Sequence, residues 1–478
     1  MRRLALVITA VFAWAAVAGA AAEEVAGLPL HVKRLNPKTI RLWVGDHVSS
    51  TAVVAFGTSK GIVVVDTVGI PQLDAELREV IARELGRSDF QILINTHEHA
   101  DHTGGNSVYG DVAIVGHEKL GPQLTARAGE RPRLVEFYTN YSAELEKRLA
   151  SHPTDSPEAQ RLKEELTLHR LNFDVVKQDA KPVPPTQTFA DRTTLDMGDT
   201  TFELYYIGGM HSASDIAVFV PEHGILLTGD TMADVWLTDT PGCLASFMAR
   251  QGIPHDFPLL LANWDLLLAK KDRIRLLLPG HWNGELSLPG AAARVDYVRT
   301  LWEGIQRSAK EGKDFAGVLA EYQLEQRFPG LAKSPGFSAR SHTGTVAEIW
   351  RVVTNQESAA SKLYALLDEG ASEAAMREVL TDRTAGRGKY FFMENDINGH
   401  GYRFLQQEKV DKAIALFKLN VELFPDSWNV YDSLGEALLK AGDTAGARKM
   451  YEKSLALNPD STSGKEALAK LRAADASK

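Results

Sequence analysis

The chain has 478 residues, of which 44% are hydrophobic and 24% are charged, and its formal net charge is −9. This composition is ordinary for folded globular proteins, and the length predicts two or three domains. The negative charge argues against nucleic acid or anionic lipid as a partner, because both attract basic patches.

Residues 1–22 are expected to be a secretory signal peptide. The segment begins with two arginines, continues with an apolar stretch to Val17, and offers small-residue cleavage sites after Ala20 and Ala22. The apolar stretch is short for a membrane-spanning helix, and no span is expected in the mature chain. Cys243 is the only cysteine, so an intramolecular disulfide is excluded. An exported protein without disulfides favours a bacterial periplasmic or secreted location.

The region that follows alternates strand-like and helical patterns. Short β-rich runs occur at 39–44, 51–57 and 61–66, and apolar spacing predicts an amphipathic helix at 71–86. This alternation predicts an α/β fold with mixed layers.

A histidine-rich motif follows the short buried strand expected at 90–95. It reads H-x-H-x-D-H and contains His97, His99, Asp101 and His102. Imidazole nitrogen and carboxylate oxygen suit zinc, iron and manganese as ligands. Side chains alternate in an extended turn, so the first two histidines point the same way, while the last two residues lie too far along to reach the same ion. The motif therefore predicts two adjacent metals.

Gly104 and Gly105 come directly after this motif. We expect them to let the backbone turn tightly close to the site. The alternative to a metal site is a surface loop that happens to be rich in His and Asp. The preceding apolar strand argues against that alternative, because sites in α/β sheets usually lie at strand ends.

Residues 121–185 predict a helical insertion, with helices at 132–148 and 156–173. Ser156 is the expected N-cap of the second helix, with Pro157 at its first position. Long inserts in compact domains are usually functional. We therefore expect a lid or wall over the metal edge, with a decorative surface insertion as the alternative.

Three later residues repeat the design of an apolar run, a glycine and a polar side chain. They are His211 after the run at 201–207, Asp230 at the end of 224–230, and His281 at the end of 274–281. Taken singly, each could be a cap or turn residue. The repetition makes all three candidate ligands.

The motifs H-x-H-x-D-H, G-G-x-H, G-D and P-G-H, in this order between Leu30 and Tyr322, resemble the metallo-β-lactamase superfamily. The resemblance implies an αββα sandwich in a catalytic domain at 23–330, with two metals at one edge. It also implies ligand roles: His97, His99 and His211 for the first metal, Asp101, His102 and His281 for the second, and Asp230 as the bridge. Asp66 matches a residue that orients a ligand histidine, with a strand-terminating role as the alternative.

The implied activity is that of a dinuclear hydrolase, with two Zn²⁺ or else Fe or Mn. A hydroxide held between the metals would attack an ester, lactone, thioester or amide bond of a small-molecule substrate, with Asp101 as the catalytic group that handles the proton. A β-lactamase is an alternative, although some of those enzymes carry Cys where this chain has Asp230. A persulfide-dioxygenase-like iron oxidoreductase is another, since His and Asp also bind iron. A third is a binding protein with a vestigial metal site.

The C-terminal region repeats with a period of 34 residues, beyond a helical connector expected at 331–393. The repeat pairs Ala413 with Ala447 and Phe417 with Tyr451. This pattern resembles tetratricopeptide (TPR) repeats. They would form an all-α region at 394–473, divided at residue 428.

A last helix is expected at 464–473, with Ser463 and Glu466 as its capping box. Two repeats and a cap are thin for independent stability. We therefore expect the repeats to pack on the helices of 338–383. They could also bind a protein or peptide partner or self-associate.

Overall fold

The structure, a computed structural model, describes residues 23–47, 50–127, 131–178, 181–232, 255–281, 286–334, 337–385 and 388–476. The expected signal peptide and Cys243 lie outside the described residues. Among the helices of those ranges, none is long and apolar enough to cross a membrane.

The first sheet has eight strands in chain order. They are β1 (Glu24–Val25), β2 (Leu28–Asn36), β3 (Thr39–Val44), β4 (Val53–Thr58), β5 (Gly61–Val65), β6 (Phe90–Ile94), β7 (Ala113–His117) and β8 (Gln187–Phe189). β1 to β5 pair antiparallel, and β5 to β8 pair parallel. Because β5, β6 and β7 run in one direction, the loops after them emerge at one edge.

The second sheet has five strands, in the order β13 (Leu276–Leu278), β12 (Ile225–Leu227), β11 (Ile216–Val220), β10 (Thr201–Tyr206) and β9 (Arg192–Asp196). Only β12 and β13 pair parallel, so the carboxyl ends of these two strands also share one edge.

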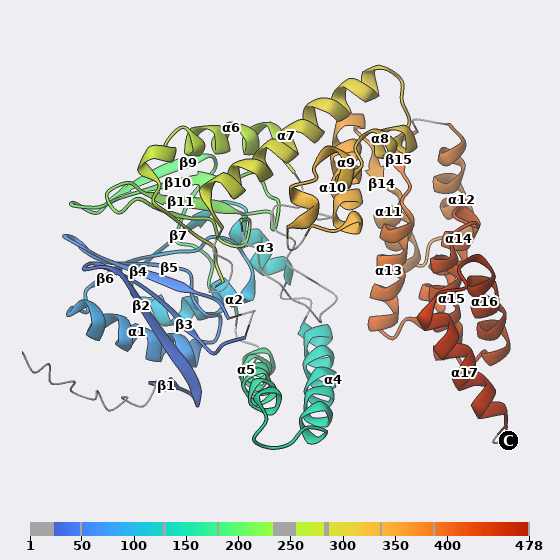
Figure 1. The fold of residues 1–478 in the computed structure, drawn as a ribbon, viewed down its shortest axis with the longest axis horizontal. Helices are drawn as coiled ribbons and strands as arrows, with labels where there is room; N and C mark the ends of the chain where they lie inside the picture. The colour runs from blue at the N-terminus through green and yellow to red at the C-terminus, as the bar shows by residue number, and fades with distance from the viewer. Residues whose placement is uncertain are drawn as a thin grey trace, which may run out of the picture.

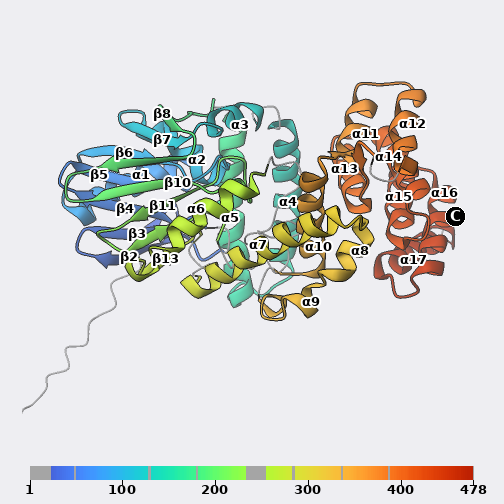
Figure 2. The ribbon, with the colours of Figure 1, turned by 90° about the horizontal axis from the view of Figure 1, so that it is seen from above.

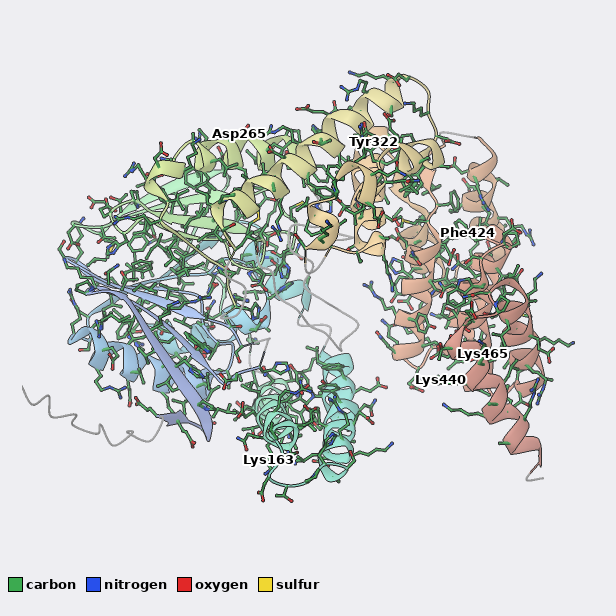
Figure 3. All side chains as sticks on the ribbon, in the orientation of Figure 1. Lys163, Asp265, Tyr322, Phe424, Lys440 and Lys465 are labelled. Atoms are coloured by element: carbon green, nitrogen blue, oxygen red, sulfur yellow. The ribbon has the colours of Figure 1, made fainter. Side chains whose placement is uncertain are left out.

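The two sheets pack face to face, as Figures 1 and 2 show. Alternation along β4 sends Val54 and Phe56 into the core between the sheets, while Val53 and Ala55 face the outer core. Helix α1 (Pro71–Leu85) covers that outer face. Helices α6 (Phe257–Leu268) and α7 (Leu288–Lys310) cover the second sheet. The predicted αββα sandwich is confirmed. Figure 3 shows that side chains fill the space between the two sheets and the spaces between the sheets and the helices that cover them.

The insertion contains α3 (Leu120–Arg127), α4 (Arg131–Ala150) and α5 (Pro157–Gln178). The last two pair as a hairpin with its own small core of Leu145, Leu162 and Leu166. Ser156 caps α5 as predicted, because its hydroxyl accepts a hydrogen bond from Ala159 N–H at 3.1 Å. In Figure 1 the α4–α5 hairpin projects from the sandwich.

The remaining chain is helical apart from a small parallel pair, β14 (Glu357–Ser358) and β15 (Tyr390–Phe391). Its helices are α8 (Phe315–Glu321), α9 (Leu324–Arg327), α10 (Ala339–Thr354), α11 (Ala359–Asp368), α12 (Glu373–Thr381), α13 (Glu394–Gln406), α14 (Val410–Leu423), α15 (Trp428–Lys440), α16 (Thr444–Leu457) and α17 (Thr462–Ala476).

The helices expected to support the repeats divide between two cores. α11 and α12 pack with α13 and α14, as predicted. α10 instead buries Val346, Ile349 and Trp350 in the core that covers the second sheet.

The predicted capping box of the last helix is wrong. Helix α17 begins at Thr462, so Ser463 lies inside it. Ser461 caps the helix instead, because its hydroxyl accepts a hydrogen bond from Gly464 N–H at 3.2 Å.

Candidate metal centre

The predicted ligands come from loops that meet at one edge of the sandwich. The H-x-H-x-D-H motif follows β6 and continues into the short helix α2 (Ala100–Thr103). His211 lies in the loop between β10 and β11, Asp230 follows β12, and His281 follows β13. Each of these loops follows the carboxyl end of a strand, and β10 runs in the same direction as β12 because both pair antiparallel with β11.

Three histidines form the first half of the centre. His97 Nε2 lies 3.0 Å from His99 Nδ1, and His211 Nε2 lies 2.8 Å from the same His99 atom. Asp230 Oδ2 is 3.4 Å from His211 Nε2 and 3.8 Å from His97 Nε2. One ligand atom from each of these four residues lies within 4.8 Å of all the others.

The second half contains Asp101, His102 and His281, again with Asp230. His102 Nε2 lies 3.4 Å from both Asp101 Oδ2 and Asp230 Oδ1. His281 Nε2 lies 3.1 Å from Asp230 Oδ2 and 3.6 Å from Asp101 Oδ2. The structure thus brings all seven predicted residues together in two groups that share Asp230, and both groups could hold a metal ion.

The buried polar atoms of the centre fit this use. His102 Nε2 and Asp230 Oδ1 are buried, and neither makes a hydrogen bond within the described ranges. Leaving such groups unpaired in a protein interior is costly. A cation between them would satisfy both, and a set of imidazole nitrogens and carboxylate oxygens suits zinc, iron or manganese.

The charges of the centre also fit a cation. Burial and the neighbouring rings of His102 and His99 lower the pKa of His97. Burial opposes charge on His102 and His281, but the carboxylates of Asp230 and Asp101, joined at His102 by Asp66, together outweigh it and raise the pKa of both. Burial likewise opposes charge on Asp230, yet His281 and His102 hold its pKa well below the usual range. The Asp230 carboxylate is therefore ionised at neutral pH, the state in which it binds a cation.

Asp66 ends β5 and supports the motif. Its carboxylate accepts hydrogen bonds from Thr96 N–H and Thr96 Oγ1, both at 2.7 Å, and from His102 Nδ1 at 3.0 Å. Asp66 therefore has both of the roles considered from the sequence: it orients a ligand histidine, and it terminates the strand with a φ of 62°.

The glycines near the centre allow close approach. Gly104 does not have the positive φ expected of a tight turn, since its φ is −61°. A Cβ there would lie 2.3 Å from the carbonyl oxygen of Gly69, so this position packs backbone against backbone. A Cβ at Gly280, beside His281, would lie 2.5 Å from Asp230 Oδ1. Gly280 is therefore needed because the chain passes directly against a candidate ligand.

The sequence did not reveal the residues whose hydrogen bonds hold the loop of His211 in place. Asp215 accepts hydrogen bonds from the N–H groups of Met210, His211 and Ser212 at 2.7 to 2.9 Å. On the other side of the turn, His255 Nδ1 donates to the Gly209 carbonyl at 2.6 Å. An acid four residues after a ligand was the available local signal for Asp215, whereas nothing local marks His255.

Arg41 in the first sheet and Thr51 in the segment between β3 and β4 were missed as well. Arg41 is buried on β3 and donates to the carbonyls of Pro279 and His281 at 3.2 and 2.7 Å. Thr51 Oγ1 donates to Asp101 Oδ2 at 3.3 Å. A charged residue inside the apolar run 39–44 was the signal for Arg41.

Comparison with known proteins identifies the domains. Residues 44–281 match the metallo-beta-lactamase superfamily model, and residues 428–471 match a tetratricopeptide repeat model. The chain is 22% identical over 251 residues to the 2,4-dinitroanisole O-demethylase subunit alpha of Nocardioides sp. (strain JS1661), covering 52% of this chain and 57% of that protein. It therefore spans little more than half the length of that relative.

Other similarities are equally distant. The chain is 23% identical over 241 residues to a type 2 metallo-beta-lactamase of Bacillus sp. (strain 170), covering 50% of this chain and 68% of that protein. A metallo-beta-lactamase structure from Pontibacter korlensis is 18% identical, with a TM-score of 0.36 over 56% of this chain and 99% of that chain. The sec-alkylsulfatase Pisa1 from Pseudomonas sp. is 12% identical, with a TM-score of 0.47 over 91% of this chain and 66% of that one.

The family matches agree with the αββα sandwich and with the helical repeats that follow it. This chain carries a metallo-beta-lactamase superfamily domain at residues 44–281 and a tetratricopeptide repeat in its C-terminal helical region.

Proposed function

We propose that this protein is an exported hydrolase with two zinc ions that cleaves an ester, lactone, thioester or amide bond of a small molecule. The observation that carries the proposal is the pair of four-residue groups that share Asp230. Nitrogen ligands dominate both groups, which favours zinc over magnesium or calcium.

The seven candidate ligands form two sets, one for each metal ion. His97, His99 and His211 would hold one ion, Asp101, His102 and His281 the other, and Asp230 both. Two such ions supply Lewis acidity and lower the pKa of a coordinated water.

Asp101 is suited to proton handling. Its side chain is 44% exposed, whereas His102 beside it is fully buried. The Asp101 carboxylate accepts a hydrogen bond from the Thr51 hydroxyl, which holds the Oδ2 atom of Asp101 in place. A carboxylate that is both fixed and reachable can orient a nucleophile and then accept its proton.

The relatives widen the set of bonds to test. One is named as an O-demethylase of 2,4-dinitroanisole and another as a β-lactamase. An aryl methyl ether and a β-lactam therefore belong beside the carboxylic substrates. Asp230 is a carboxylate where some β-lactamases carry a thiolate, so the ester and lactone substrates are preferred here.

A substrate panel on metal-loaded protein tests the proposal. The panel contains ester, lactone, thioester, amide, phosphodiester, sulfate ester, aryl ether and β-lactam compounds, and elemental analysis accompanies it. About two zinc ions per chain and turnover of a carboxylic substrate support the proposal. Less than one metal per chain after zinc reconstitution contradicts it, and bound iron with oxygen consumption replaces it with the oxidoreductase alternative.

A further inference from the structure

We propose that Glu348 of α10 is a positioning residue for the first metal, because it holds the His255 ring that in turn fixes the loop of His211. Helix α10 lies outside residues 44–281, which match the metallo-beta-lactamase superfamily model. The functional unit would therefore include a helix from the region that follows the sandwich. This inference rests on the proposed two-metal function and adds a positioning residue to it.

The loop of His211 begins with a glycine turn that packs against the start of α6. Gly208 and Gly209 both have positive φ values, 81° and 67°. The Gly209 carbonyl accepts a hydrogen bond from His255 Nδ1 at 2.6 Å. The Gly208 carbonyl accepts one from Asp256 N–H at 3.1 Å, and a Cβ at Gly208 would lie 2.9 Å from the Asp256 carbonyl oxygen. Because His211 is two residues beyond this close contact, a shift of the turn moves the candidate ligand.

The His255 ring faces a carboxylate on its other edge. Its Nδ1 carries a hydrogen, because a carbonyl oxygen can only accept a hydrogen bond. The opposite nitrogen, Nε2, lies 4.0 Å from Glu348 Oε2. Phe257 stacks on the ring, with the two ring centroids 5.3 Å apart. These contacts fix the orientation of an imidazole whose side chain is fully buried.

The Glu348 carboxylate is itself held in place. Arg351, one turn further along α10, donates to Glu348 Oε2 from Nε at 3.0 Å and from Nη2 at 2.7 Å. Val346 and Ile349 of the same helix are buried in the core that covers the second sheet. The packing of α10 and the pairing with Arg351 therefore set the position of the carboxylate that His255 faces.

Stability alone does not explain an acid at this position. The Glu348 side chain is only 5% exposed. A buried ion pair gains little over apolar side chains of similar volume, because the loss of hydration offsets the attraction between the charges. The contacts from Glu348 through His255 to Gly209 end two residues before His211. Orientation of that candidate ligand gives the buried carboxylate a use.

Glu348→Gln tests the inference because it removes the charge and keeps the volume of the side chain. Two readouts are measured on full-length protein. They are the zinc affinity of each site, by competition with a chromophoric chelator, and the d–d absorption of Co²⁺ that replaces zinc at the first site. His342→Gln is the matched control, since His342 is a buried polar residue of the same helix whose partners are the Tyr297 hydroxyl and the Tyr322 carbonyl.

Glu348→Gln is expected to weaken zinc binding at the first site by about 10-fold, as loss of a residue that supports a ligand typically does. The cobalt bands of the first site should shift, because the geometry of the His211 ligand changes. His342→Gln should change the first-site affinity by less than about 2-fold, even where it lowers the unfolding temperature as much. An unchanged first site in Glu348→Gln, or an equal loss in His342→Gln, overturns the inference.

A double-mutant cycle shows whether Glu348 acts through His255. His255→Asn keeps an amide nitrogen near the place of Nδ1 and removes the atom that faces the carboxylate. When His255→Asn is already present, Glu348→Gln should weaken the first site by less than about 2-fold further. A full second loss of about 10-fold would mean that the two residues act independently, and it would overturn the inference.

The same measurements separate this inference from the proposed function. Two bound metals without turnover of any compound in the panel contradict only the proposed function. Unchanged zinc binding in Glu348→Gln contradicts only the role of Glu348, and a wild type that binds no metal overturns both.

Discussion

Asp66 accepts a hydrogen bond from Nδ1 of His102 at 3.0 Å, and this contact turns Nε2 of the same ring toward Asp230 and Asp101. A histidine that donates from Nδ1 carries its free lone pair on Nε2, which is the atom placed to bind the second metal. Asp66 thereby sets both the orientation and the tautomer of a candidate ligand from the adjacent strand end.

Asp66→Asn should therefore weaken the second metal site. An amide turned toward His102 donates instead of accepting, which favours the tautomer with hydrogen on Nε2. Replacing such a supporting partner typically costs about 10- to 100-fold in metal affinity. Competition with a chromophoric chelator measures this, and the first site serves as the internal control. Equal loss at both sites would show general unfolding instead.

Asp101→Ala should leave the first metal in place yet abolish turnover. The substitution removes a ligand of the second metal and the exposed carboxylate that handles the proton. His99→Ala is the matched variant, because it should strip the first metal and also lower the unfolding temperature, since bound metal stabilises only the native state. Elemental analysis and hydrolysis rates distinguish the two. A full hydrolytic rate in Asp101→Ala would refute the two-metal hydrolase.

Asp230→Ala should weaken both sites together. The Asp230 carboxylate lies within 3.4 Å of His211, His102 and His281, so its charge serves both groups. Without it, two cations would face each other with one negative charge fewer between them. Metal content per chain should fall below one at zinc concentrations that saturate wild type. Retention of two metals would rule out the shared role.

Truncation of the chain after α10 should leave the core that contains α10 intact, because the core formed by α11 to α14 is separate from it. A protein ending at Asn355 keeps α10 on α7 and should retain metal and some turnover. One ending at Ala385 also keeps the centre, but it exposes Leu363 and Leu367, which α13 and α14 otherwise cover. We expect that longer form to aggregate more readily. Size-exclusion chromatography with metal analysis checks both, and complete inactivity of a soluble, metal-loaded form ending at Asn355 would contradict this division.

The repeat region should lose stability in mild acid. Burial and the charge of Arg403 lower the pKa of His400 to about 4, against 6.5 for an ordinary histidine. The unfolded chain therefore binds the proton more readily, so stability is intact above pH 6.5 and falls as the pH drops toward 4. For a partly exposed ring the loss by pH 5 is about 1 kcal/mol. Urea unfolding at pH 7.5 and 5.0 should show it, and His400→Gln should flatten the difference.

The seven candidate ligands were predictable from the sequence because the signal is local. Each lies directly after an apolar run or in a dense motif, and strand ends are where such sites form. The helices of the α4–α5 hairpin were also predictable from the sequence, since Ser156 and Pro157 mark the beginning of α5. A helix boundary was harder to predict where two nearby residues could both cap the helix. At α17 the cap is Ser461, whereas Ser463 was predicted.

What the tertiary structure decided is the support of those ligands. Arg41 reaches the backbone around His281, and His255 reaches Gly209, across large sequence separations. The same is true of α10, which joins the core of the sandwich while α11 joins the repeats. The physical reason is that ligand chemistry and helix starts depend on neighbours in sequence. The hydrogen bonds and packing that hold a ligand in place depend on which distant strands and helices become neighbours in space.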